Sequence, residues 1–509
     1  MIFQPRNNRD ILLSTILFSV SFAPSPFGYL IYFALIPVIR MSIRSNPRDA
    51  FFCGYIVGLL TSMILLHWIA IYNPWYYLIF IPINALQIGV FTLIISVIGR
   101  RNRIGAIIIF PFLWTSLDFL REFGPFAFTW LNIGYTQSNF LYLIQFAEFT
   151  GTIGIIFWIC LVNMLLLLLW DYRHIRFRLA LFMSMIILLF LLPFVHGKHI
   201  LTKERQMPGI VCAYIQPNIR NEIKWAPSLQ EKNLWKLLAE SQNVLSYSPG
   251  LIIWPETALP YDYKKYPQLN DILSGWVVDH RLRILTGILD REGSERYNAA
   301  VLIDGKNPEN VTIYHKMRPV PIAEKSMWLW TSDTNAISSG IDYTLFDFSV
   351  SEIVLSYKDE DWKIDARSLN LKDVHFAVLI CFESAFPTMA QKMTEKGADF
   401  LTIMTNDESF GYSAQPHQHL QIARMRAIEN RRSVIHCANT GISAFIDPLG
   451  NIFQRSGLFE PARAVQPVPL WTSKSFYTLN AHWMGWIYIS ISLILGVYLI
   501  FRSPIKEGL

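Results

Sequence analysis

The chain has 509 residues, of which 52% are apolar and 16% charged, with a formal net charge of +6. This length allows two or three domains, and the apolar fraction exceeds that of an ordinary soluble protein, which indicates a membrane protein. The basic residues stand in short clusters between apolar runs, which favours lipid headgroups over nucleic acid as partners, and five cysteines leave at least one thiol outside any disulfide.

Eight apolar runs approach the length of about 20 residues that a bilayer-spanning helix needs. The predicted spans are 10–24, 28–43, 51–71, 77–98, 104–120, 150–170, 179–196 and 483–501. The first two are short and are interrupted by Pro24 and Pro26. The first run shows no small-residue cleavage site and further spans follow it closely, so we expect a retained helix and not a removed signal peptide.

Basic clusters alternate with connections that are almost free of basic residues. The clusters are Arg6 and Arg9; Arg40, Arg44 and Arg48; Arg100, Arg101 and Arg103; Arg173, Arg176 and Arg178; and Arg502 with Lys506. The connection after the fifth span begins with Arg121 alone. The positive-inside rule then predicts two cytoplasmic termini and an outer location for the region between the last two spans. Buried core helices of a soluble protein are the alternative interpretation.

Between residues 205 and 475 the composition changes to that of a globular domain. Predicted strands are 209–215, 251–254, 283–289, 299–303, 375–380, 399–404, 433–438 and 443–446, and predicted helices are 229–246, 384–396 and 415–431. Continuous Ile, Val and Leu runs suit buried strands, and the alternation with helices predicts an α/β domain. The expected organisation is a seven-helix membrane domain (1–200), a catalytic domain (205–475), an eighth membrane helix (483–501) and a cytoplasmic tail (502–509).

Three unlike ionisable residues stand at the ends of predicted strands or in loops. They are Glu256 in IIWPETALP, Lys316 in IYHKMRPVPIAE and Cys381 in FAVLICFESAFP. Each alone has an ordinary structural explanation: a turn cap, a solvated loop charge and a core thiol. Together they supply a nucleophile, a base for its proton and a cation for a thiolate or an oxyanion. Strand-end positions allow them to meet at one edge of a sheet.

A metal site is a weaker interpretation of another pattern. His417 and His419 form an HxH that metal ions use, but a helix start explains the pair equally well. The glycine-rich phosphate loop, the GxSxG and HExxH motifs and paired CxxC motifs do not occur. We therefore expect no metal and no cofactor.

The order and spacing of the three motifs resemble the Glu-Lys-Cys triad of the nitrilase, or carbon-nitrogen hydrolase, superfamily. Together with the eight spans, the chain resembles the membrane branch of that superfamily, the apolipoprotein N-acyltransferases. Further stretches carry the resemblance: FTWLNIGYTQ (128–137), AYIQPNIRNEIKW (213–225) and MTNDESFGYSAQPHQHLQIARMRAIENRR (404–432). It implies an α-helical membrane domain of eight spans and an extracytoplasmic α/β domain of the αββα sandwich type.

The resemblance also implies roles for individual residues. Glu256 would be the general base, Lys316 the stabiliser of thiolate and oxyanion, and Cys381 the nucleophile. Glu324 and Glu383 are similar to the family's two supporting acids, although hydrogen bonding to the lysine or the backbone explains them as well.

Aromatic residues are expected to contact lipid. Trp225 resembles a lipid-positioning aromatic of the family, and Phe382 stands beside the nucleophile where many members have tyrosine. Trp328 and Trp330 lie in a long stretch after Glu324 that we interpret as an arm dipping into the membrane interface; a packed insertion is the alternative. Ser409 and Ala323 also depart from the family pattern, where tryptophan and glycine are common, and leave loop shape and lipid fit in doubt.

The activity implied by the resemblance is a two-step acyl transfer through a thioester on the cysteine, which completes lipoprotein maturation. The donor would be a membrane phospholipid, and the acceptor the α-amino group of the S-diacylglyceryl-cysteine at the N-terminus of an apolipoprotein. The expected location is the bacterial cytoplasmic (inner) membrane, with the catalytic domain on the outer face, and the expected state is a monomer. Two alternatives stay open: a membrane-tethered amidase of the nitrilase type, and a non-catalytic transporter or binding protein. The latter needs polar groups at mid-membrane, where Asp118 is nearly the lone charge.

Overall fold

The structure, a computed structural model, describes residues 5–203, 207–309, 311–321, 324, 336–350, 352–357, 360–365 and 373–501. The chain divides into two compact units. The first, here called the helical unit, consists of Met1–Thr202 and Asn480–Leu509. The second, the sheet unit, is Lys203–Leu479.

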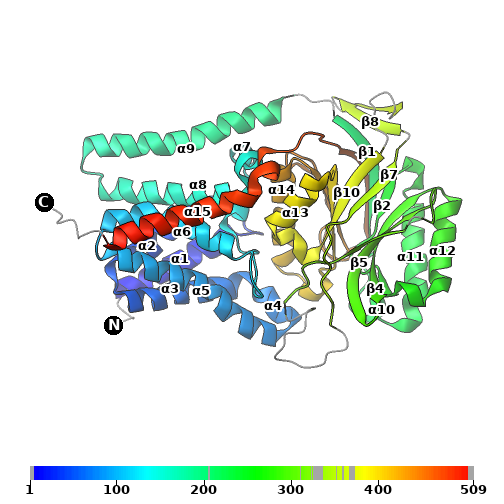
Figure 1. Cartoon of the computed structure of the whole chain (residues 1–509), viewed down its shortest axis with the longest axis horizontal. Helices are drawn as coiled ribbons and strands as arrows, with labels where there is room; N and C mark the ends of the chain where they lie inside the picture. The colour runs from blue at the N-terminus through cyan, green and yellow to red at the C-terminus, as the bar shows by residue number, and fades with distance from the viewer. Residues whose placement is uncertain are drawn as a thin grey trace. The chain divides into compact units, whose positions relative to one another are not determined.

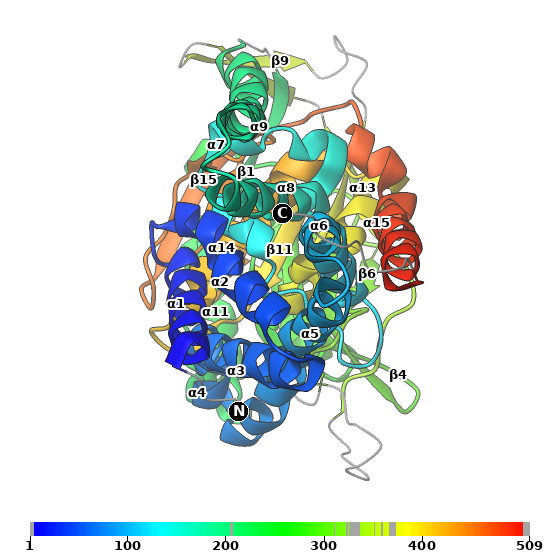
Figure 2. The same cartoon turned by 90° about the vertical axis from the view of Figure 1, so that its left-hand side faces the viewer.

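The helical unit consists of helices that run side by side (Figure 1), and Figure 2 views them from their ends. The helices are α1 (Pro5–Ser21), α2 (Ile31–Arg44), α3 (Pro47–Leu65), α4 (His67–Tyr72), α5 (Pro74–Gly99), α6 (Arg103–Leu120), α7 (Leu141–Ile144), α8 (Ala147–Asp171), α9 (Arg176–Thr202) and most of α15 (Phe476–Phe501). Short 3-10 helices, η1 (Gly28–Leu30) and η2 (Ile133–Gln137), lie in the connections.

Asparagine residues fix the beginnings of three of these helices. The side-chain oxygens of Asn46, Asn73 and Asn102 each accept a hydrogen bond from a backbone N–H in the first turn of α3, α5 and α6, respectively. Proline follows directly at Pro47 and Pro74, where its missing N–H costs nothing. The sequence therefore sets where the long apolar helices start.

Six helices among the described residues are long and apolar enough to cross a membrane: α3, α5, α6, α8, α9 and α15. They correspond to six of the eight predicted spans. The first two predicted spans form α1 and α2, of 17 and 14 residues, which are shorter. The third predicted span is divided at Leu66 into α3 and α4. The count of eight spans is therefore not confirmed, whereas a set of apolar helices in the N-terminal region is.

Two sheets form the centre of the sheet unit. In the first, the strand order is β6 (Thr312–His315), β5 (Glu295–Asp304), β4 (Arg283–Glu292), β2 (Leu251–Ile253), β1 (Met207–Gln216), β8 (Glu352–Tyr357), β9 (Glu360–Asp365), with β15 (Ala462–Pro469) paired to β1 and β3 (Leu259–Asp262) to β4. In the second, it is β14 (Ile452–Phe453), β13 (Ala444–Ile446), β12 (Ser433–Ala438), β11 (Phe400–Thr405), β10 (Asp373–Ile380), β7 (Leu345–Ser349). The central pairs of both sheets are parallel.

Helices cover the outer faces of the two sheets (Figure 1). On the first sheet, α11 (Gln230–Gln242) and α12 (Pro267–Asp279) bury leucines such as Leu234 and Leu273 against Ile252 and Ile284. On the second sheet lie α13 (Pro387–Lys396) and α14 (Gln415–Asn430). Short helices, among them α10 (Asn221–Lys224), fill connections.

The inner faces of the two sheets meet. Cys437 of β12 lies with its Sγ 3.5 Å from the carbonyl oxygen of Ile215 and 3.4 Å from that of Ile253, both in the first sheet. The rings of Tyr214 and Phe445 also pack across the interface, 5.3 Å apart. The unit is therefore an αββα sandwich, as predicted. The buried strands at its centre, such as β11 with every residue buried, account for the continuous apolar runs in the sequence.

Candidate active site

Three strand ends position the predicted triad within the sheet unit. Glu256 lies in the loop after β2, Lys316 follows the last residue of β6, and Cys381 follows the last residue of β10. Cys381 opens a 3-10 turn, η7 (Cys381–Ala385), with a backbone φ of 53°. This left-handed conformation is costly for a residue with a side chain, and such strain is concentrated at functional sites.

Lys316 stands between two carboxylates. Its Nζ lies 3.2 Å from Glu256 Oε1 and 2.8 Å from Glu324 Oε2, and its side chain is 1% exposed. Burial acts to lower the pKa of Lys316, but Glu324, Glu256 and Cys381 outweigh it, so the pKa is raised. Lys316 is therefore a cation at neutral pH. The pKa of Glu324 is lowered: burial acts to raise it, but Lys316 and several hydrogen bonds prevail.

Two further groups fix the Glu256 carboxylate. Asn298 donates from Nδ2 to Glu256 Oε1 at 2.8 Å and also to Glu324 Oε1 at 3.0 Å. The backbone N–H of Asn406 donates to Glu256 Oε2 at 2.9 Å. The two oxygens of the expected base thus have different partners, and Asn298 binds both acids to one another. The sequence reasoning did not find Asn298 or Asn406, since an amide in a strand or loop carries no signal of its own.

The Cys381 thiol is partly exposed, unlike the other four cysteines, which are buried. Its pKa is raised well above the ordinary value, first by burial and then by Glu256 and Asp407, against Lys316 and a hydrogen bond with Thr405. A thiol with a raised pKa carries its proton at neutral pH. Nucleophilic attack therefore requires a base that removes this proton at the moment of reaction.

Glu383, two residues after the cysteine, holds two loops together. Its Oε1 accepts hydrogen bonds from the hydroxyl of Tyr314 at 2.8 Å and from the backbone N–H groups of Met317 and Arg318, and its Oε2 accepts from Ile380 N–H at 2.7 Å. These donors flank Lys316 on one side and Cys381 on the other. Burial raises the pKa of Glu383 to about 7 despite these hydrogen bonds. Its geometry is that of a structural support.

The aromatic residues expected at lipid differ in exposure. Trp225, directly after α10, is 44% exposed. Phe382 is buried and packs edge-on against Phe386 with ring centres 5.1 Å apart, so its ring stabilises the turn that carries Cys381. Trp328 and Trp330 lie outside the described residues, as does Ala323. Ser409 accepts a hydrogen bond from Asn221 of α10, which joins the two loops.

A second lysine, which was not predicted from the sequence, lies at the site. Lys224 is 2% exposed, and its Nζ donates to the backbone carbonyl of Glu256 at 2.9 Å. Burial lowers its pKa to about 7, against Glu256 and Glu408, which act to raise it. In NEIKW the lysine belongs to a short helix with charged residues, which is expected to be exposed to solvent, so the sequence pattern does not indicate its burial.

A fully buried polar network supports the turn at the cysteine. Ser384 Oγ donates to the carbonyl oxygen of Cys381 at 2.9 Å and lies 2.8 Å from His419 Nε2, while His419 Nδ1 faces Asp407 Oδ1 at 3.6 Å. His417 lies elsewhere, with its Nδ1 3.3 Å from an Arg455 nitrogen. The two histidines of the HxH pattern therefore have separate partners and do not share a metal site.

Another group of three possible metal ligands is present among the described residues. The ligand atoms of Asp290, Glu292 and His315 lie within 4.8 Å of one another. Lys264 Nζ is 3.0 Å from Asp290 Oδ1 and already supplies a positive charge there. The arrangement is that of an ion pair beside a hairpin.

The site and fold agree with comparisons against known proteins. Residues 212–468 match the family model described as carbon-nitrogen hydrolase. This match covers half of the sequence, and the chain belongs to the carbon-nitrogen hydrolase family. Residues 14–165 match a second model, described as the apolipoprotein N-acyltransferase N-terminal domain.

Curated relatives match along nearly the whole chain. An apolipoprotein N-acyltransferase of Geobacter metallireducens is 28% identical, over 98% of this chain and 97% of its own length. Another, of Chlorobaculum tepidum, is also 28% identical, over 96% and 95%. Among solved structures, an amidase from Nesterenkonia sp. aligns with 54% of this chain and 95% of its own at 17% identity and a TM-score of 0.36, too low to support any conclusion. The predicted family is thus confirmed, together with the predicted enzyme class, an acyltransferase.

Proposed function

We propose that this chain transfers an acyl chain from a membrane phospholipid to the α-amino group of the S-diacylglyceryl-cysteine at the N-terminus of apolipoproteins. The observation that carries the proposal is the buried lysine between Glu256 and Glu324, tied through Glu383 to a partly exposed cysteine. A cation, a base and a thiol in one site are what acyl transfer through a thioester requires. The curated relatives that match both units carry the name of this activity.

In the first step, Cys381 Sγ attacks the carbonyl carbon of a phospholipid ester while Glu256 takes the thiol proton. Lys316 stabilises the oxyanion of the tetrahedral intermediate. The C–O bond then breaks, and Glu256 passes its proton to the departing hydroxyl of the lysophospholipid. A thioester on Cys381 results. Glu324 keeps Lys316 charged and in place throughout.

In the second step, the neutral α-amino group of the acceptor attacks the thioester carbonyl. A C–N bond forms and the C–S bond breaks, while Glu256 takes a proton from the nitrogen and returns it to the sulfur. The amide product is the N-acylated lipoprotein. Neither step calls for a metal or a cofactor, because the protein's own residues move every proton and stabilise every charge.

Both substrates are anchored in a bilayer, since each buried methylene contributes about 0.8 kcal/mol to membrane binding. We propose eight spans, with α1 and the η1–α2 pair as the two short ones. Each would extend about 25 Å, and a bilayer adapts to such helices by thinning. The basic clusters support cytoplasmic termini and an outer, extracytoplasmic sheet unit in the inner membrane.

The surroundings of the site in this proposal are lipid. Trp225 positions the acyl donor, as its exposure beside the buried Lys224 allows. Trp328 and Trp330 complete the proposed lipid contacts, whereas the buried ring of Phe382 shapes the turn beside Cys381. The enzyme works as a monomer and uses no nucleic acid.

Product analysis tests this function. Purified protein in detergent is incubated with a phospholipid of known acyl chains and a synthetic lipopeptide that carries an N-terminal S-diacylglyceryl-cysteine. The proposal predicts N-acylated lipopeptide and lysophospholipid in equal amounts, both absent in Cys381→Ser and in Glu256→Gln. Release of free fatty acid with unmodified lipopeptide would instead indicate a hydrolase and refute the proposed acceptor.

A further inference from the structure

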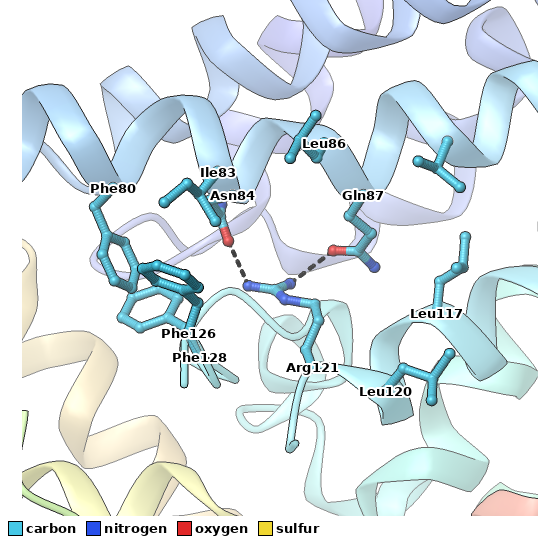
Figure 3. Close-up of a pocket in the computed structure, with 11 residues that line it drawn as sticks. Phe80, Ile83, Asn84, Leu86, Gln87, Leu117, Leu120, Arg121, Phe126 and Phe128 are labelled. Atoms are coloured by element: carbon cyan, nitrogen blue, oxygen red, sulfur yellow. Dashed lines mark hydrogen bonds between the residues drawn. The ribbon is translucent and has the colours of Figure 1, made fainter. Parts of the chain in front are cut away.

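The helical unit contains a cavity of about 250 Å³ bounded by α5, α6 and the loop after α6 (Figure 3). Its walls are mainly apolar: Phe80, Ile83, Leu86, Val90, Leu117, Leu120, Phe126 and Phe128. Three of these side chains, Leu86, Leu120 and Phe126, are also 37–44% exposed. The cavity therefore opens onto an apolar surface of the helices.

One charged side chain projects into this apolar cavity. Figure 3 shows the Arg121 guanidinium between Asn84 and Gln87 of α5. Its Nη2 donates to Asn84 Oδ1 at 2.6 Å and its Nη1 to Gln87 Oε1 at 2.8 Å. A longer contact of 3.4 Å joins Nη1 to Asp118 Oδ1. A guanidinium has five N–H donors, so two, including that on Nε, have no acceptor among the described residues.

The level of Arg121 along the bundle matches that of lipid headgroups. Helix α6 has 18 residues and extends about 27 Å, close to the thickness of about 30 Å of a hydrocarbon core. Arg121 is the next residue, so a bilayer centred on α6 would place its guanidinium where the hydrocarbon ends and the phosphates begin.

The Asp118 carboxylate does not occupy all the N–H donors of Arg121. Asp118 Oδ1 also accepts a hydrogen bond from Gln87 Nε2 at 3.0 Å, and its contact with Arg121 is the longest of the three that the guanidinium makes. The amide oxygens of Asn84 and Gln87 orient the guanidinium instead. A planar fork of N–H groups held in this way is suited to a phosphate or carboxylate ligand.

We propose that this cavity is a binding site for a membrane glycerophospholipid, with Arg121 as the ligand of its phosphodiester. The first part of one acyl chain would lie among Leu86, Val90 and Leu117. The volume is below the range of about 300–1,000 Å³ typical of sites that enclose a whole ligand, so the rest of the lipid lies on the exposed apolar surface. Every lining residue belongs to the helical unit, so the proposal stands or falls independently of chemistry at Cys381.

Photolabelling of the full chain tests the site. A Cys381→Ser variant, which cannot form a thioester, is placed in nanodiscs of phosphatidylethanolamine and phosphatidylglycerol with a trace of phosphatidylglycerol carrying a diazirine near the ester end of one chain. After illumination, digestion and mass spectrometry, we expect adducts in peptides that contain residues 80–90 and 117–128. Labelling there should fall about tenfold or more in Asp118→Asn/Arg121→Gln, as expected for lost charge-assisted hydrogen bonds.

The double substitution avoids leaving Asp118 as a lone buried charge. Arg173→Gln, at an exposed arginine of the same unit, is the matched control and should label as the parent does. Val90→Phe, which fills the cavity without altering a charge, should also reduce labelling.

Two further experiments test whether the phosphate group of the lipid is required and whether free phosphate competes for the site. A diacylglycerol probe with the same diazirine lacks the phosphate and should label these peptides weakly. Equal labelling by diacylglycerol, unchanged labelling in the double variant, or loss of labelling on addition of millimolar inorganic phosphate would each overturn the proposal. Arg121→Lys, which keeps the charge but not the fork, should retain part of the labelling.

Discussion

Replacing Lys316 by methionine removes the cation that lies between two carboxylates. Lys316 Nζ is 3.2 Å from Glu256 and 2.8 Å from Glu324, and the side chain is almost completely buried. Breaking a buried pair from one side costs about 3–5 kcal/mol, because a charge is left without its partner. Loss of an oxyanion stabiliser typically slows catalysis about 100- to 1,000-fold. Lys316→Met should therefore lower both the thermal stability and the rate of acyl transfer.

A second variant separates the two effects. Lys316→Met/Glu324→Gln removes one of the two stranded carboxylates, so we expect it to recover a substantial part of the lost stability. The rate should not recover, because the oxyanion still lacks its cation. Lys306→Met, at an exposed lysine of the same unit, is the matched control and should leave both properties unchanged.

The stability loss has a predictable dependence on pH. Lys316 holds the pKa of Glu324 below its ordinary value of 4.5. A carboxylate with a lowered pKa in the folded state contributes stability above its ordinary pKa and loses it as the pH falls. The difference in melting temperature between the parent and Lys316→Met should therefore be widest near pH 7 and should narrow as the pH falls toward 4.5 and below.

Two measurements check this reasoning. The rate of lysophospholipid release reports the chemical step, and intrinsic fluorescence during heating in detergent reports the melting temperature at each pH. A folded Lys316→Met protein that retains a rate within about threefold of the parent would refute the assigned role of the lysine, since the expected loss is at least about 100-fold.

Three other substitutions test the surrounding contacts. Lys224→Met should raise the melting temperature at pH 6 by more than at pH 9.5. A buried lysine with a pKa of about 7 destabilises the folded state at low pH, and this destabilisation diminishes as the pH rises toward 10.5, the ordinary pKa of lysine. An equal change at both pH values would contradict the burial argument. Glu383→Gln should destabilise the protein more than Tyr314→Phe. The glutamine amide turns its own N–H groups toward backbone N–H donors, and each donor left without an acceptor costs about 1–3 kcal/mol, whereas the phenylalanine removes only one of the four donors to Glu383. Melting temperatures in the reverse order would be inconsistent with a structural role for Glu383. Ser384→Ala should slow thioester formation about tenfold with a small change in the KM for phospholipid. The substitution removes the hydroxyl that links the carbonyl oxygen of Cys381, a residue with a left-handed backbone, to His419. An unaltered rate in a less stable protein would mean that this network contributes only to folding.

The positions of Glu256 and Cys381 at strand ends were predictable from the sequence because the strands are buried. Continuous apolar runs marked β2 and β10, and the first ionisable groups beyond such runs, Glu256 and Cys381, lie at strand ends in the structure. A rule of parallel sheets, that strand ends meet at one edge, then brings distant residues together. Lys316 did not follow from this logic, because the short strand β6 that precedes it in the structure was not predicted.

The partners of these residues were not predictable in the same way. Glu383 matched a supporting acid of the family in sequence, but the particular backbone N–H groups, from two loops, that donate to its oxygens were not predicted. Such contacts depend on tertiary folding and leave no periodic trace. Lys224 was not predicted because lysine is almost never fully buried, and a four-residue helix rich in charged residues is normally exposed to solvent. Asn298, a single amide within a strand, gave no signal at all.

Membrane spans show a different limit of the sequence. Hydropathy found all six long helices, although some ends differ by six or seven residues, because helix length and apolar content are what a bilayer selects. The two short runs remained ambiguous, since α1 and α2 are of lengths that occur both in membranes and in soluble cores. Helix α12 was not predicted, although its buried residues Leu269, Leu273 and Val277 recur at the four-residue spacing of a helical stripe.

The most direct test of the account is whether a thioester forms on Cys381. Purified protein is incubated with a phospholipid of defined acyl chains, without acceptor, and its intact mass is measured. We predict a gain of one acyl chain, lost on treatment with neutral hydroxylamine, mapped to the peptide containing Cys381 and absent in the folded Cys381→Ser variant. A folded parent protein that gains no mass, or an acyl chain attached to another residue, would contradict the central claim.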